Sequence, residues 1–340
     1  MGSFKMSGFN ENEHSAVGTK PRRKMIRVPF AAAAAVFFSM LGIIAVLAVT
    51  AAVLAGKLGQ AEAEPVMEPY VPVVNERVYD FYDEDDIIIM DDYDYGTIWL
   101  PAFTNVPRHG YDYSGLVLKD GRYTYSENGE QISRTGIDVS YHNGDIDWQR
   151  VAEDGVDFAI LRVGYRGYES GALNLDERFH EYIQGARDAG LDVGVYFFSQ
   201  ALTAEEAIEE ANFVMEQIRG YEVTFPVIFD WEFMDSDGAR TSDTAPYTVT
   251  ECAAAFCDTI KDGGYKPMVY GSRRFALLKL DMSKLADYDF WFAEYKDGHN
   301  EPTYPYNYQI WQYASDGTVD GIEGEVDMNI CFANYGKEEA

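Results

Sequence analysis

The chain has 340 residues, and its 57 Asp and Glu outnumber its 27 Lys and Arg, giving a formal net charge of -30 at pH 7. This balance argues against nucleic acid as a partner, because binding a phosphate backbone needs a cationic surface. Cys252, Cys257 and Cys331 are too few for a disulfide framework, so we expect buried small apolar side chains. The spacing of zinc sites is absent from the sequence, and neither a metal ion nor a cofactor is expected.

A long apolar segment lies near the N-terminus. Residues from Val28 to Gly56 include no charged side chain, and as a helix they could cross a hydrocarbon core of about 30 Å. A cleavable signal peptide is the competing interpretation, since Ala61-Glu62-Ala63 resembles a cleavage site, but its apolar region is usually only about 7 to 15 residues long. We therefore predict an uncleaved transmembrane signal anchor over residues 28–56.

The flanks of this segment predict its orientation. The tail formed by residues 1–27 carries a basic cluster, whereas the chain beyond the segment soon becomes acidic. Positive residues favour the cytoplasmic side. We expect a single-pass protein of the cell membrane, with the N-terminus in the cytoplasm and the remainder outside. The basic residues are Lys20, Arg22, Arg23, Lys24 and Arg27.

Residues 57–114 are predicted to form an acidic stalk. Between Lys57 and Leu100 there are twelve Asp or Glu residues, and such a segment repels itself and resists compaction. Its apolar stretches 87–90 and 98–100 could still dock locally on the main domain. The acidic run around Asp92 lacks the spacing of a calcium-binding loop and is interpreted as solvated.

Residues 115–134 are predicted to be a small β-hairpin lead-in. Their side chains alternate in polarity around Asp120-Gly121 and Asn128-Gly129, and such dipeptides favour the tight turns of hairpins.

From Thr135 to Ala340, short apolar runs alternate with amphipathic helical ones, which favours an α/β fold and an irregular TIM-like β/α barrel. The helical pattern becomes sparse in the last third. The predicted strands are 136–139, 158–163, 193–199, 225–232, 267–271, 290–295, 308–312 and 326–330. The predicted helices are 148–154, 177–189, 204–218, 249–262 and 273–279, with Thr203 and Thr248 as caps of the third and fourth.

Acidic residues stand at the ends of these strands. Asp138 ends the first strand, Asp230 and Glu232 end the fourth, and Asp327 begins the last. Residues two apart on a strand face the same side, and parallel barrel strands converge at one mouth, so the four could share a cavity. Crowded carboxylates oppose one another's ionisation, which keeps at least one protonated to higher pH. Cleavage of a glycosidic bond needs such an acid.

Aromatic residues accompany the acids at the strand ends. Flat amphipathic rings suit the apolar faces and polar rims of sugars, although core packing explains each ring equally well. The residues concerned are Tyr165, Tyr196, Tyr270, Trp291, Tyr295, Trp311 and Tyr313. Five of them are our candidates for substrate binding: Tyr165, Tyr196, Tyr270, Tyr295 and Trp311.

Four ordered motifs resemble those of the family 25 glycoside hydrolases, and the resemblance covers roughly residues 135–334. They are Gly136-Ile137-Asp138-Val139-Ser140, Phe229-Asp230-Trp231-Glu232, Trp291-Phe292-Ala293-Glu294-Tyr295, and Trp311-Gln312-Tyr313 followed by Val326-Asp327. The resemblance implies an irregular β/α barrel and a lysozyme, or muramidase, that hydrolyses the β-1,4 bond between N-acetylmuramic acid and N-acetylglucosamine in peptidoglycan. Cell-wall remodelling would be its role.

The same resemblance implies individual roles. Glu232 matches the general acid/base, and Asp230 matches the partner that orients a substrate acetamido group or stabilises the positive centre. Asp138 and Asp327 match acidic positions that tune Glu232 and bind substrate or water. Whether the reaction is retaining, inverting or assisted by the acetamido group stays open, because carboxylate separation is not fixed by sequence.

Three other interpretations remain. A chitinase-like barrel of family 18 also ends its fourth strand in Asp-x-Glu, but its motif has a further Asp where this chain has Ile228. A non-catalytic peptidoglycan-binding membrane protein would not need all four acids. A purely structural role for Asp230 and Glu232 would suit an isolated pair, but not the ordered set of motifs.

Overall fold

The computed structural model describes residues 87–340, except 235, 237, 296–300 and 337–340. The chain divides into two units, residues 1–73 and 74–340, and the described residues belong to the second. The predicted tail, the anchor at 28–56 and the first part of the stalk lie outside the described residues. Within the described ranges, no helix combines the length and apolarity needed to cross a bilayer.

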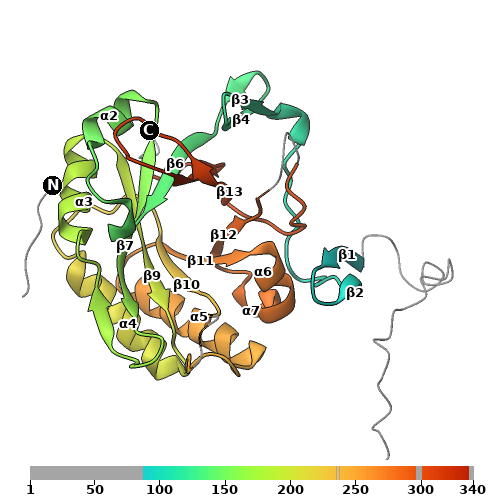
Figure 1. Cartoon of the computed structure of the whole chain (residues 1–340). Coiled ribbons are helices and arrows are strands. Elements are labelled where there is room, and N and C mark those ends of the chain that lie inside the picture. Colours follow the sequence, from blue (N-terminus) through green and yellow to red (C-terminus); the bar gives the residue numbers. More distant parts are fainter. Residues whose placement is uncertain (1–86, 235, 237, 296–300, 337–340) are drawn as a thin grey trace, which may run out of the picture. The chain divides into compact units, whose positions relative to one another are not determined.

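Eight strands close into a barrel, as predicted from the sequence (Figure 1). Neighbouring strands run parallel from β6 round to β13, whereas β14 runs antiparallel to both β13 and β6. A short ninth strand, β8 (Leu173–Leu175), pairs with the outer end of β7. The barrel strands are β6 (Arg134–Val139), β7 (Phe158–Arg166), β9 (Asp192–Ser199), β10 (Val227–Trp231), β11 (Pro267–Ser272), β12 (Asp289–Ala293), β13 (Ile310–Gly317) and β14 (Val326–Cys331).

Helices cover one part of the barrel's outer surface, with α3, α4 and α5 along β7, β9 and β10 (Figure 1). The Thr203 hydroxyl caps α4 by accepting a hydrogen bond from the Glu206 amide, as predicted. The predicted Thr248 cap was wrong. Helix α5 begins two residues earlier, at Pro246, whose fixed φ suits the first helical turn. The α-helices are α2 (Trp148–Glu153), α3 (Phe179–Asp188), α4 (Ala204–Gln217), α5 (Pro246–Asp262), α6 (Arg273–Lys279) and α7 (Met282–Leu285).

The lead-in forms a three-stranded antiparallel sheet of β3 (Leu116–Lys119), β4 (Arg122–Glu127) and β5 (Glu130–Gln131). Asp120, Gly121, Asn128 and Gly129 all have positive φ, from 51° to 85°, as the turn dipeptides predict. This sheet packs on the barrel. The ring centroids of Tyr123 and Trp311 are 4.8 Å apart, and those of Tyr111 and Phe332 are 4.5 Å apart. The lead-in therefore covers the outer face of β13 and β14, where helices are sparse.

The predicted stalk is folded from residue 87 onward, contrary to an extended acidic spacer over all of 57–114. Strands β1 (Ile87–Asp92) and β2 (Gly96–Pro101) pair as a hairpin. Asp92, interpreted from sequence as solvated, is only 5% exposed and forms an ion pair with Arg274. The apolar residues of this segment find partners, and one of its acids is neutralised, so self-repulsion does not keep it extended.

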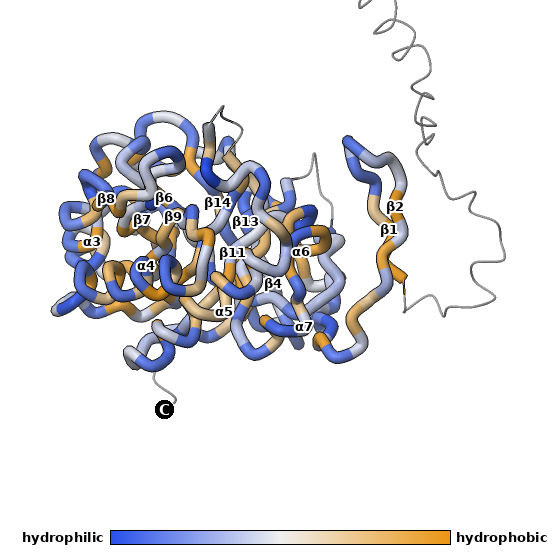
Figure 2. The backbone as a smooth tube through the Cα atoms, turned by 90° about the horizontal axis from the view of Figure 1, so that it is seen from below, coloured by the Kyte–Doolittle hydropathy of each residue, from blue (hydrophilic) through white to orange (hydrophobic). Residues whose placement is uncertain are grey.

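Alternation along the strands separates two apolar layers. Residues such as Ile160, Ile228 and Met268 point into the barrel, whereas Val195 and Phe229 point outward against the helices. Figure 2 shows the hydrophobic residues gathered along strands such as β7, β9 and β11, with hydrophilic loops around them. The three cysteines are buried and free, as expected. Polar side chains at the strand ends therefore lie above a closed apolar floor.

Candidate active site

A cavity of about 280 Å³ opens at the mouth of the barrel. It brings together all four acids identified in the sequence, with three of the five candidate sugar-binding aromatics. Its lining consists of Asp138, Ser140, His142, Arg162, Tyr196, Phe198, Asp230, Glu232, Tyr270, Trp291, Tyr295, Gln312 and Asp327.

Strand direction explains why the acids meet. Asp138 and Asp230 are inward-facing residues near the C-terminal ends of β6 and β10, and Glu232 follows β10 directly. Because β14 is antiparallel to its neighbours, its beginning lies at the same mouth, and Asp327 stands opposite Asp138 in the strand register. An eighth parallel strand would have placed Asp327 at the barrel's far end.

Asp138 is held by buried amides on the last two strands. Its Oδ2 accepts hydrogen bonds from Gln312 Nε2 and Asn329 Nδ2, both at 2.8 Å. The Gln312 Oε1 accepts from the hydroxyls of Tyr270 and Tyr295, each at 2.8 Å. The amides thus fix the acid and two cavity tyrosines as one network, and a matching bond joins Trp291 Nε1 to Asn329 Oδ1 at 2.8 Å.

The acids of the cavity are poised to retain protons. Burial raises the pKa of Asp138 to about 6, with the amide hydrogen bonds opposing this shift, and burial with the charges of Asp138 and Glu232 raises the pKa of Asp327 to about 8. Burial, followed by the charges of Glu232 and Asp138, raises the pKa of Asp230 well above its ordinary range. Glu232 is exposed as a residue, yet its carboxyl lies deep enough that desolvation raises its pKa too. Proton donors near neutral pH are therefore available.

Arg162 places a cation beside these acids. It forms an ion pair with Asp176 at 2.8 Å, its positive charge opposes the rise in the pKa of Asp230, and its Nη2 is buried without a hydrogen-bond partner. Among the buried side-chain atoms without a partner, Oδ1 of Asp230 is another. Two unpaired polar atoms on the cavity lining are suited to a polar ligand.

The main chain at Glu232 is fixed from behind by Gln200, which is fully buried. Gln200 Nε2 donates to the Glu232 carbonyl at 2.7 Å, and its Oε1 accepts from the Thr241 hydroxyl at 2.8 Å. This link holds the start of the loop after β10, so the Glu232 side chain projects from a constrained backbone. Sequence reasoning missed Gln200, because it directly follows β9 and belongs to no motif.

The five predicted sugar-binding aromatics separate into three groups. Tyr196, Tyr270 and Tyr295 line the cavity. Tyr165 lies outside the lining, at the end of β7, with the Arg162 guanidinium 5.6 Å from its ring. Trp311 was predicted wrongly. It is 1% exposed and packs outward against Tyr123, because the adjacent Gln312 occupies the inward position.

Three cavity residues that sequence reasoning overlooked had a usable signal. Arg162, Gln312 and Asn329 are polar residues within otherwise apolar strand patterns. Each lies on the inward face of its strand, and Asn329 shares that face with Asp327. A polar residue inside a buried strand needs a partner, so alternation counted from the acids would have identified them.

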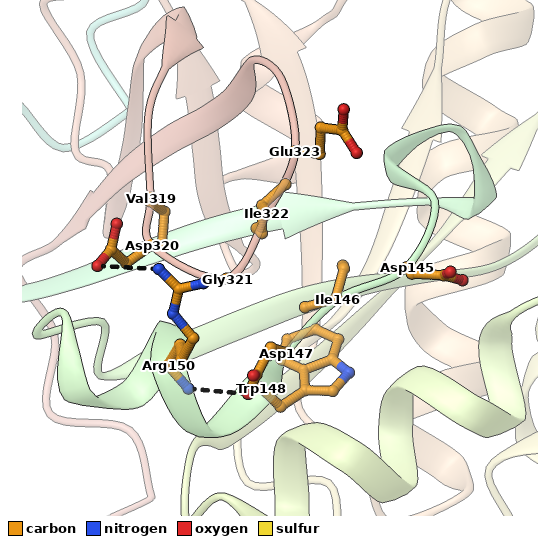
Figure 3. A pocket seen from close by; sticks show the side chains of 10 residues that line it. All are labelled: Asp145, Ile146, Asp147, Trp148, Arg150, Val319, Asp320, Gly321, Ile322 and Glu323. Carbon is orange, nitrogen blue, oxygen red and sulfur yellow. Dashed lines mark hydrogen bonds and ion pairs between the residues drawn. The ribbon is translucent and has the colours of Figure 1, made fainter.

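A larger hollow, of about 700 Å³, lies outside the barrel mouth (Figure 3). It is bordered by the start of α2 and the loop before β14, and Arg150 pairs with Asp320 across it at 3.4 Å. Its acids are solvated, since the side chains of Asp145 and Asp320 are 93% and 71% exposed. Size therefore does not identify the active site. The enclosed acids at the barrel mouth are the stronger candidate.

The fold and this cavity define a β/α-barrel protein with an acidic site of the kind found in hydrolases. Residues 137–322, more than half of the chain, match the model of the glycosyl hydrolases family 25, and the chain belongs to that family.

Relatives support the same placement. The chain is 26% identical over 194 residues to an autolytic lysozyme of Clostridium acetobutylicum, covering 57% of this chain and 54% of that protein. It is 26% identical over 206 residues to lysozyme M1 of Streptomyces globisporus, covering 57% and 66%. The chain thus spans about half the length of the first relative and just under two thirds of the second.

Solved structures show the same fold. The modular autolysin LytC of Streptococcus pneumoniae, in complex with a synthetic peptidoglycan ligand, superposes with a TM-score of 0.52 at 25% identity, covering 72% of this chain and 56% of that one. The spore cortex lytic enzyme SleM of Clostridium perfringens has a TM-score of 0.51 at 21% identity, covering 61% and 68%.

The raised pKa values predict that rising pH weakens the fold. Where the folded-state pKa of an acid exceeds its unfolded value near 3.8, the native state binds more protons, so stability is lost as pH rises from about 4 through the folded pKa. For Asp327 this window extends to about pH 8. We expect Asp327→Asn to flatten the decline of the unfolding free energy between about pH 5 and 8, by at most about 1.4 kcal/mol per pH unit.

Urea denaturation at several pH values measures this slope. Asp320→Asn, at a solvated acid, is the matched control and should keep the wild-type slope. An Asp327→Asn slope equal to that of the control would contradict the assignment.

Proposed function

We propose that this chain is a peptidoglycan hydrolase of the lysozyme type, cleaving the β-1,4 bond between N-acetylmuramic acid and N-acetylglucosamine. The observation that carries the proposal is the pair of Asp230 and Glu232 at the mouth of the barrel, both with raised pKa values and both lining a cavity with tyrosines. Family membership and the two relatives named as lysozymes support the substrate class.

Glu232 is our candidate for the general acid. It is the solvent-accessible member of the pair, and its raised pKa keeps a proton available for the leaving glycosidic oxygen. After the bond breaks, the same carboxylate can accept a proton from the attacking water. Asp138 and Asp327 act on Glu232 through their charge and their contacts with the cavity.

The decisive test is Glu232→Gln, which keeps the shape of the side chain and removes its proton-transfer capacity. We expect the release of new reducing ends from purified peptidoglycan to fall by about 10²- to 10⁴-fold or more, with an unchanged circular dichroism spectrum. Glu251→Gln, at an exposed position on α5, is the matched control and should retain full activity.

Polymeric chitin provides the second arm of this assay. Ile228 is fully buried on the barrel floor, where the family 18 motif would have an additional acid. We therefore expect no cleavage of chitin. Efficient chitin cleavage would favour the chitinase-like alternative, and full activity of Glu232→Gln would refute the catalytic assignment.

Asp230 is suited to orienting the substrate acetamido group. It is 5% exposed, its pKa is strongly raised, and its Oδ1 lacks a hydrogen-bond partner. Such a group can hydrogen-bond an amide and stabilise the positive charge that develops as the acetamido oxygen attacks the anomeric carbon. The proposed reaction is therefore acetamido-assisted, rather than a direct attack by water or by a carboxylate.

A substrate analogue with a hydroxyl in place of the acetamido group tests this mechanism. We expect kcat to fall by at least about 10²-fold, the range for losing a well-placed catalytic group, while the dissociation constant changes much less. Single-turnover kinetics and equilibrium binding separate the two quantities. Unchanged turnover of the analogue would exclude acetamido assistance.

We also propose that the chain is anchored in the cell membrane, with its barrel outside. The support is the uncharged segment from 28 to 56 and the basic residues that precede it. Protease added to intact cells should remove the barrel, whereas a cytoplasmic control protein survives. A protected barrel, or a barrel found mainly in the culture medium, would contradict this topology.

A further inference from the structure

A second cavity, of about 270 Å³, adjoins the first. Glu232 and Tyr270 line both cavities, so a ligand that passes Glu232 can continue from one into the other. The far wall of the second cavity comes from two elements outside the described barrel motifs, the β1–β2 hairpin and helix α6. Its lining consists of Tyr93, Trp231, Glu232, Phe233, Tyr270, Gly271, Ser272, Arg274, Phe275 and Lys279.

The hairpin turn is fixed in place by charge. Asp92 accepts hydrogen bonds from the main-chain amides of Asp94 and Tyr95, at 2.9 and 3.1 Å, which orders the turn. Arg274 of α6 pairs with Asp92 and, at 2.8 Å, with Asp94. The Arg274 hydrogen bond also lowers the pKa of Asp92 to about 2, so this attachment persists throughout the neutral and mildly acidic range.

This attachment presents an aromatic surface next to Glu232. The Arg274 guanidinium carbon lies 4.4 Å from the centre of the Tyr93 ring, which remains 82% exposed. Across the cavity, Phe233 is 39% exposed, and its ring lies 6.1 Å from that of Phe275. Exposed rings held beside a polar cavity suit the apolar faces of sugar residues.

We propose that the β1–β2 hairpin completes an additional saccharide subsite, in which Tyr93, Phe233 and Phe275 bind a sugar of the same glycan chain that reaches Glu232. The inference rests on the proposed glycan-hydrolysing function. The hairpin lies outside residues 137–322, which match the family, so this subsite is a property of this chain's own N-terminal segment. Continuity through Glu232 and Tyr270 identifies the occupant as part of the substrate.

The subsite predicts a dependence on glycan length. A short fragment that fills only the first cavity cannot reach Tyr93, whereas a long chain can. In the full chain, Tyr93→Ala should lower the ratio of kcat/KM for long peptidoglycan chains to that for the shortest cleaved fragment by about three- to tenfold, as expected for the loss of one ring contact. Tyr93→Phe, which keeps the ring, should retain most of the wild-type ratio.

Tyr95→Ala is the matched control. Tyr95 is 69% exposed on the same turn but does not line the cavity, so its removal should leave the ratio unchanged. An unchanged ratio in Tyr93→Ala, or an equal fall in Tyr95→Ala, would overturn the subsite.

Binding measurements separate this proposal from the proposed activity. Long glycan chains titrated into Glu232→Gln should bind about three- to tenfold more weakly when Tyr93→Ala is added. If the wild type cleaves no peptidoglycan but this difference in affinity appears, the activity fails and the subsite stands. If cleavage occurs and the affinity is unchanged, the subsite fails and the activity stands.

Discussion

The paired amide bonds to Asp138 join the strands on which the barrel depends for closure. Gln312 and Asn329 come from β13 and β14, and Asp138 from β6, so three strands converge on one carboxylate oxygen. A buried carboxyl without these donors would be costly, and buried amides without an acceptor would be too. The same contacts that close the barrel therefore set the protonation of its acidic cavity.

Much of this arrangement follows from sequence. Strand periodicity identified all eight barrel strands, and the acids at their ends predicted a shared mouth. The direction of β14 could not be deduced, because an apolar strand has the same pattern whichever way it runs. Its consequence is specific: Asp327 reaches the cavity from the start of its strand.

The errors at Trp311 and in the stalk have a common physical cause. An aromatic residue at a strand end can point to either face, and local sequence does not show what covers the outer one. Here the lead-in supplies Tyr123 as the covering partner. The acidic composition of residues 57–114 likewise conceals Asp92, whose partner Arg274 is 182 residues away in the chain. Long-range neutralisation of this kind cannot be inferred from local charge density.

Closure of the barrel by its first and last strands affects when the active site can form during synthesis. Asp138 leaves the ribosome early, but its amide partner Asn329 and the neighbouring acid Asp327 are made almost two hundred residues later. A growing chain that has not reached β14 lacks the donors that order Asp138 and has no closed barrel mouth. The hydrolytic site is thus completed only when the barrel's last strand has been translated, so incomplete chains lack an assembled site with which to attack the wall.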